Sequence, residues 1–130
     1  MYVFSNKSLT KNHFMFLNLK HTKLDIFQAT KTFTLECYKA TKLLPADERF
    51  AMVQQIRRAA LSVHLNVAEG CSRKSETERR RYYEIARGSL NEVDTAFDIA
   101  IQLQFCTEEN LKTLGEKIIS AYKQLCGLIG

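Results

Sequence analysis

Residues 54–90 decide the fold; they read QQIRRAALSVHLNVAEG (54–70) and CSRKSETERRRYYEIARGSL (71–90). In and just before the first part, apolar residues recur every three or four positions, as they do on the buried face of a helix: Val53, Ile56, Ala60, Val63 and Val67. Gly70 then interrupts the pattern, as expected of a residue that caps the end of a helix. The stretch therefore predicts two consecutive helices joined by a short turn.

The other side of the first of these helices is polar but also carries leucines. At about 100° of rotation per residue, one surface strip collects seven residues, which we call the polar stripe: Gln55, Arg58, Leu61, Ser62, Leu65, Asn66 and Glu69. Its polar groups either pair with neighbouring helices, within or between subunits, and fix their register, or form a contact between copies of the chain. A contact between copies of the chain would also explain Leu61 and Leu65, because a solvent-exposed helix face does not normally carry two leucines among its polar residues.

Helical patterns continue on both sides of this stretch. Pro45 separates one helix from the next, the Ser75-x-x-Glu78 capping box starts a third, and Thr107 starts a fourth. The expected helices cover residues 25–44, 46–69, 75–104 and 108–128. The third should bury one face, widened by Leu90 and Phe97 and otherwise formed by Tyr82, Ile85, Ala86, Ser89, Val93, Ala96, Ala100 and Leu103.

Length and composition agree with a single helical domain. The chain has 130 residues but only one proline and five glycines, too few for the frequent turns of an all-β fold. Four amphipathic helices with short connections predict an all-α fold, an antiparallel up-down-up-down four-helix bundle. We assign residues 23–130 to the bundle and residues 1–22, which lack a clear period, to an N-terminal arm or disordered extension.

Positive charge gathers near the start of the third expected helix. From residue 57 to residue 87 the chain has eight cations and four anions. Three consecutive arginines, about one turn inside the N-terminus of this helix, oppose the helix dipole, and nothing in folding requires them there. We therefore expect a nucleic-acid-binding patch, formed by Arg73, Lys74, Arg79, Arg80, Arg81 and Arg87. The alternative is a solvated face balanced by the nearby glutamates.

No motif indicates catalysis or a bound metal. The chain lacks P-loops, nucleophile elbows and paired Glu-x-x-His motifs, and its four cysteines are far apart in sequence. Reduced thiols, no catalytic residues, no metal and no cofactor are expected. No apolar run is long enough to span a membrane, and the N-terminus is a poor signal peptide. A cytoplasmic protein without a membrane partner is therefore expected.

Three segments of the chain resemble a known family: QIRRAALSVHLNVAEG (55–70), CSRKSE (71–76) and IARGSLNE (85–92). They are similar to the four-helix-bundle proteins encoded in intervening sequences of bacterial large-subunit ribosomal RNA genes, and the resemblance covers about residues 24–129. His64 departs from it, because the family often has proline there. The resemblance implies a bacterial bundle that assembles into a ring, a pentamer. A related branch, the accessory protein of diversity-generating retroelements, binds nucleic acid and its reverse transcriptase.

These observations favour a non-enzymatic, ring-forming bundle that binds structured RNA or DNA through its basic patch. Its expected partners are further copies of itself, RNA or DNA and, by analogy with the related branch, a protein such as a reverse transcriptase. The alternative is a homo-oligomeric scaffold with no nucleic-acid role.

Overall fold

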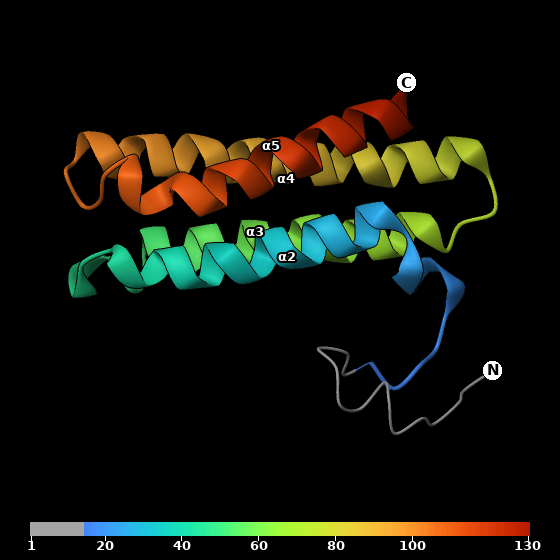
Figure 1. The fold of residues 1–130 in the computed structure, drawn as a ribbon, viewed down its shortest axis with the longest axis horizontal. Coiled ribbons are helices and arrows are strands. Elements are labelled where there is room, and N and C mark those ends of the chain that lie inside the picture. The colour runs from blue at the N-terminus through green and yellow to red at the C-terminus, as the bar shows by residue number, and fades with distance from the viewer. Residues whose placement is uncertain (1–14) are drawn as a thin grey trace.

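The structure, a computed structural model, describes residues 15–130, and this part of the chain is helical and contains no strand (Figure 1). The four long helices are α2 (Asp25–Ala40), α3 (Met52–Cys71), α4 (Glu76–Gln102) and α5 (Lys112–Ile129). Short 3-10 turns flank them, namely η1 (Lys20–Lys23), η2 (Thr41–Leu43), η3 (Ala46–Glu48) and η4 (Glu109–Leu111). The all-α four-helix prediction is confirmed, and the expected boundaries differ mainly where a 3-10 turn replaces a terminal α-helical turn.

The expected N-terminal arm, residues 1–22, lies mostly outside the described residues, which begin at Met15. Where the chain enters the described part, residues 15–20 are exposed. Thr22 is buried within η1, and its carbonyl accepts a hydrogen bond from Gln28 Nε2 at 2.8 Å. Packing of the chain onto the bundle therefore begins at about Thr22, just before α2.

The four helices form two layers, α2 with α3 and α4 with α5 (Figure 1). Each of α2 and α4 packs against both α3 and α5. Thr30 of α2 contacts His64 of α3, whereas Thr41, at the other end of α2, contacts Arg57. Residue numbers thus run in opposite directions along the pair, and α2 and α3 are antiparallel.

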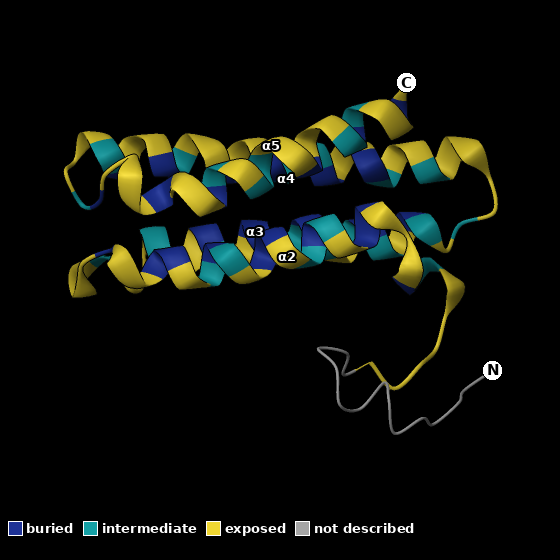
Figure 2. Cartoon of the chain, in the orientation of Figure 1, coloured by how far each residue is buried: buried dark blue, intermediate teal, exposed yellow. Residues whose placement is uncertain are grey.

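The buried sides of the helices meet between the two layers (Figure 2). Along α2 the residues spaced four and three apart are all buried, with Phe33 and Cys37 fully enclosed: Ile26, Thr30, Phe33, Cys37 and Ala40. Along α3, Ile56, Ala60 and Val63 are also enclosed. The three-and-four spacing therefore located the inner faces of these two helices correctly.

The predicted buried row of α4 is partly wrong. Ile85 and Leu103 are 42% and 53% exposed, and the buried residues of α4 are Tyr83, Ala86, Leu90, Val93, Phe97 and Ala100. α4 packs against both α3 and α5, so its inner face points between these two neighbours. The predicted face correctly included the buried Leu90 and Phe97, but it extended too far at Ile85 and Leu103, and Ser89 and Ala96 within it are only half-buried.

Gly70 has a different role from the predicted helix cap. α3 continues through Gly70 to Cys71, and the backbone of Gly70 does not adopt a positive φ. A Cβ at this buried position would lie 2.8 Å from Cε1 of Tyr83 and 3.1 Å from Cβ of Tyr82. Glycine is therefore required because α4 approaches the backbone of α3 here, since real Cβ atoms do not tolerate so short a contact.

His64 is a boundary residue between α2 and α3. Its Nδ1 lies 2.9 Å from the Thr30 hydroxyl, and its ring centroid is 4.5 Å from that of Phe27. Burial, assisted by the positive charge of Lys31, lowers the pKa of His64 to about 4. The imidazole is therefore neutral at pH 7 and acts as a packing and hydrogen-bonding group.

Replacing Gly70 with alanine should lower the free energy of unfolding by about 1 to 3 kcal/mol, the usual cost of overpacking a core. The matched control is Gly88→Ala in α4, where no heavy atom lies within 4 Å of the added Cβ. That control should gain about 0.5 to 1 kcal/mol from helix propensity. Denaturant unfolding followed by circular dichroism, at one protein concentration, measures both. A Gly70→Ala variant as stable as the parent would contradict the close-approach explanation.

Candidate nucleic-acid interface

The predicted basic run lies around the turn between α3 and α4. Ser75 caps α4, because its hydroxyl accepts a hydrogen bond from the Glu78 backbone N–H at 3.2 Å. The predicted capping position is therefore confirmed. Acids in the first turn, Glu76 and Glu78, complement the helix dipole.

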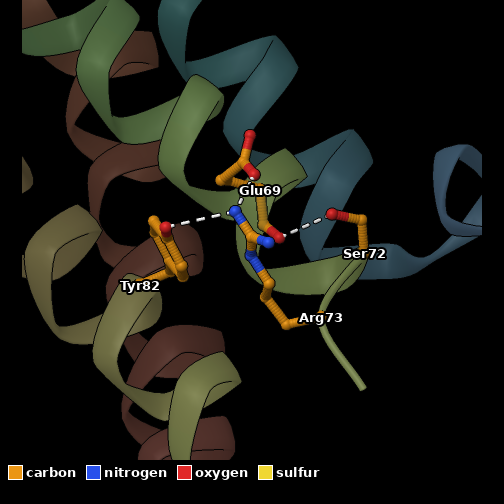
Figure 3. A network of polar contacts seen from close by, with 4 residues as sticks. All are labelled: Glu69, Ser72, Arg73 and Tyr82. Carbon is orange, nitrogen blue, oxygen red and sulfur yellow. Dashed lines mark hydrogen bonds and ion pairs between the residues drawn. The ribbon is translucent and has the colours of Figure 1, made fainter. Parts of the chain in front are cut away.

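Arg73 is held against the molecule by residues from both helices (Figure 3). Its guanidinium forms an ion pair with Glu69 and donates a hydrogen bond to the Tyr82 hydroxyl at 3.3 Å. It also lies over the Tyr82 ring, 5.2 Å from the centroid. The hydrogen bond to Tyr82 raises the pKa of Arg73, so the group stays charged. Ser72 closes the turn by donating to the Glu69 carbonyl at 2.8 Å.

Arg79 folds back over the same turn. Its Nη1 donates to the carbonyls of Arg73 and Lys74, at 3.0 and 2.7 Å. These two carbonyls belong to the connection, where a charged donor satisfies them more strongly than a neutral one. The expectation that folding requires none of the three arginines is therefore wrong for Arg79, which helps to hold the turn.

The remaining cations of the run point outward. Arg80 approaches Glu76 at 3.5 Å, with 50% of the Arg80 side chain and 79% of the Glu76 side chain exposed. Lys74 and Arg81 are exposed, and within residues 15–130 their side chains form neither an ion pair nor a hydrogen bond. We call Lys74, Arg80 and Arg81 the basic tip.

Arg87 lies further along α4, apart from the basic tip. It is half-buried and turned toward α5, where its Nη1 lies 3.6 Å from the Cys126 sulfur. This contact raises the pKa of Arg87. The structure therefore divides the six predicted phosphate-contacting residues into a tip, two residues that build the turn, and the separate Arg87.

Most of the polar stripe is paired within the subunit. Gln55 donates to Glu92 of α4, the hydroxyls of Ser62 and Ser89 are 3.1 Å apart, and Asn66 donates to the Ser62 carbonyl at 2.9 Å. Together with the pair between Glu69 and Arg73, these contacts support the first explanation of the stripe, that its polar groups fix helix register.

The outermost residues of the stripe are not covered. Leu61 and Leu65 are 41% and 57% exposed. Arg58 is exposed, and its side chain has no hydrogen-bonding partner in the described part of the chain. These three side chains remain candidates for a contact between subunits.

Three of the four thiols are not activated for chemistry. Burial raises the pKa of Cys37, Cys71 and Cys106, and burial together with the neighbouring Cys71 also raises that of Tyr83. Groups with a raised pKa stay protonated and are poor nucleophiles at neutral pH. Among residues 15–130, no three His, Cys, Asp or Glu side chains gather into a group able to hold a metal ion.

Charge is unevenly distributed along the bundle. From residue 88 to residue 111 the chain has five acids and neither lysine nor arginine. This segment leads to the α4–α5 connection, at the opposite end of the bundle from the basic tip (Figure 1). It contributes Asp94, Asp98, Glu108 and Glu109 to a surface cavity of about 690 Å³. The sequence interpretation did not consider this acidic end, although the absence of cations is visible in the sequence.

Arg79→Gln should lower the free energy of unfolding by about 1 kcal/mol, because it removes the donors to two loop carbonyls. The control, Arg81→Gln, removes the same charge from an exposed position and should stay within about 0.5 kcal/mol of the parent. Amide hydrogen exchange should speed up at residues 73–75 in the first variant only. Equal effects of the two substitutions would show that Arg79 does not hold the turn.

The chain is similar to a solved structure and to a protein family. No curated protein matches the chain. Among solved structures, a protein of unknown function from the S23 ribosomal protein family of Bacteroides thetaiotaomicron has the same fold, with a TM-score of 0.73 and 21% identity. The match covers 80% of this chain and 97% of that one. Within residues 15–130, no helix is long and apolar enough to cross a membrane.

The sequence model of one protein family matches residues 22–127, which include all four helices and the basic turn. Because this match spans most of the chain, the protein belongs to the family of 23S rRNA-intervening sequence proteins.

Proposed function

We propose that this protein is a non-enzymatic, ring-forming bundle, a pentamer, that binds structured RNA or DNA through phosphate contacts from its basic tip. The observation that carries the proposal is the construction of the α3–α4 turn. Arg73 and Arg79 are used to hold the turn, and Lys74, Arg80 and Arg81 remain exposed on it. A fixed backbone that presents cations loses little conformational entropy when a phosphate binds.

Within residues 15–130 one carboxylate, that of Glu76, contacts the tip, and a phosphate can displace it. The Arg80–Glu76 pair is solvent-exposed and 3.5 Å long. Exposed pairs of this kind contribute about 0 to 1 kcal/mol. A phosphodiester offers Arg80 a stronger, charge-assisted interaction, with release of counterions from the nucleic acid.

The acidic segment at the opposite end of the bundle favours one orientation of the bound nucleic acid. The acidic segment 88–111 repels a polyanion, whereas the tip attracts it. Nucleic acid should therefore approach along the α3–α4 turn. One subunit offers few cations, but a ring repeats the tip and raises its effective concentration along one polyanion.

The family's name is a further support, because it associates these proteins with intervening sequences of 23S rRNA. RNA folded into helices presents a regular array of phosphates, which the tip could contact without reading base sequence. Little sequence preference is expected, since within residues 15–130 none of the tip cations lies over an aromatic ring on which a base could also stack.

Changing Lys74, Arg80 and Arg81 together to Gln should weaken RNA and DNA binding and reduce its salt dependence. Each lost phosphate contact should lower the log–log salt slope by roughly 0.7 to 0.9. The matched control changes Lys112, Lys117 and Lys123 of α5 to Gln, which removes the same net charge elsewhere. Fluorescence anisotropy at several salt concentrations measures both. If the two triple variants lose affinity equally, binding depends only on net charge and the tip is not the site.

The proposal that the subunits assemble rests on a separate observation, the exposure of two leucines in the polar stripe. A subunit partner that covers Leu61 and Leu65 would remove apolar surface from water. Replacing Leu65 with Glu should therefore shift the protein toward monomer in light scattering. The control is Ile119→Glu on α5, because Ile119 is 56% exposed and Leu65 is 57% exposed. A parent protein that is monomeric at micromolar concentration would end the ring proposal and leave a monomeric nucleic-acid-binding bundle.

A further inference from the structure

A second cationic site lies on the outer side of α2 and α3, away from the basic tip. It is a surface cavity of about 510 Å³ lined mainly by Leu35, Glu36, Tyr38, Lys39, Lys42 and Arg57. We propose that this cavity binds a phosphate ester and that Arg57 is its central ligand. This inference does not depend on the proposed role of the tip, because it concerns other residues and a ligand as small as a nucleotide.

The Arg57 guanidinium is fixed in one orientation. Its Nε donates to the Thr41 hydroxyl at 2.9 Å, and its plane lies over the Tyr38 ring, 4.9 Å from the centroid. The Thr41 hydroxyl in turn donates to the Tyr38 carbonyl at 2.8 Å, and Thr41 is only 2% exposed. Because the Thr41 hydrogen is used in this bond, the Thr41 oxygen is oriented to accept from Arg57. The orientation of the guanidinium plane is therefore fixed by a buried residue.

This anchoring leaves the two terminal nitrogens of Arg57 free. They form no hydrogen bond within residues 15–130, and no carboxylate of that part of the chain lies within 4.0 Å of them. A half-buried arginine that lacks an acidic partner is unusual, since buried charges are normally paired. An anion in the cavity would supply the missing partner.

The charges around the cavity favour an anion with more than one negative oxygen. Lys39, Lys42 and Arg57 carry three positive charges there, and Glu36, the one acid that the described residues contribute to the lining, already pairs with Lys39 at 3.0 Å. A planar guanidinium can bind two oxygens of one phosphate, and lysines add point charges beside it. Leu35, which is 57% exposed, and Tyr38 give the cavity an apolar side where a ribose or base could lie.

Equilibrium dialysis of the full-length protein against uridine monophosphate and against inorganic phosphate tests the proposal. Arg57→Lys keeps the charge but loses the two-oxygen contact, so affinity for both ligands should fall about tenfold, the change expected for 1.4 kcal/mol. Thr41→Val, which only frees the arginine plane, should weaken binding less. Arg49→Gln removes a guanidinium from an exposed neighbouring position and should leave affinity unchanged. Circular dichroism confirms that each variant is folded.

Two results would overturn the inference. One is an Arg57→Lys variant that binds uridine monophosphate as tightly as the parent. The other is displacement of phosphate by acetate at matched ionic strength, which would mean that any anion binds.

The basic-tip triple variant should still bind the nucleotide, so the proposal for this cavity and the proposal for the tip are tested independently. Loss of long RNA binding in Arg57→Lys would assign the site to backbone phosphate, and its retention would assign the site to a free nucleotide. Both of these results uphold a phosphate-ester site.

Discussion

The structure depends on the close approach of α3 and α4 where Gly70 meets Tyr83. A missing Cβ lets the two helices come together, so that the Tyr83 ring fills the space beside the α3 backbone. The turn that joins the two helices follows directly, at residues 72–75. Because the turn is short, Arg73 can reach back to Glu69 and across to Tyr82, and Arg79 can reach the turn's carbonyls. A side chain at position 70 would therefore disturb the core and the proposed binding surface together.

Much of the fold could be predicted from the sequence, because apolar spacing and capping residues act locally. The inner faces of α2 and α3 and the cap at Ser75 follow from such signals. The inner face of α4 was placed only partly correctly, because the predicted row took in Ile85 and Leu103, which the structure leaves exposed. Gly70 was mistaken for a cap because the sequence does not show how closely another helix will approach it.

The candidate site could be predicted less well. Neighbouring arginines look equivalent in the sequence, yet they differ in what lies within reach of each one. Arg79 finds backbone carbonyls, Arg80 finds a glutamate one turn away, and Arg81 extends into solvent. Arg57 was not assigned to any site, because its orientation depends on Thr41 of another helix. Some arginines form hydrogen bonds that stabilise the fold, and others remain exposed and can contact a ligand. The sequence does not distinguish these two groups.

The separation of charge along the bundle has a consequence for any cyclic assembly. In the layer formed by α4 and α5, the basic tip at the α3–α4 turn and the acidic segment toward the α4–α5 connection form a charge dipole. In a ring, the subunits are related by rotation about one axis. The components of their dipoles perpendicular to that axis cancel, and the components along it add. A ring in which α4 lies along the axis would therefore carry the basic tips on one face and the acidic segments on the other, and the electric field of a polyanion would orient the ring before contact.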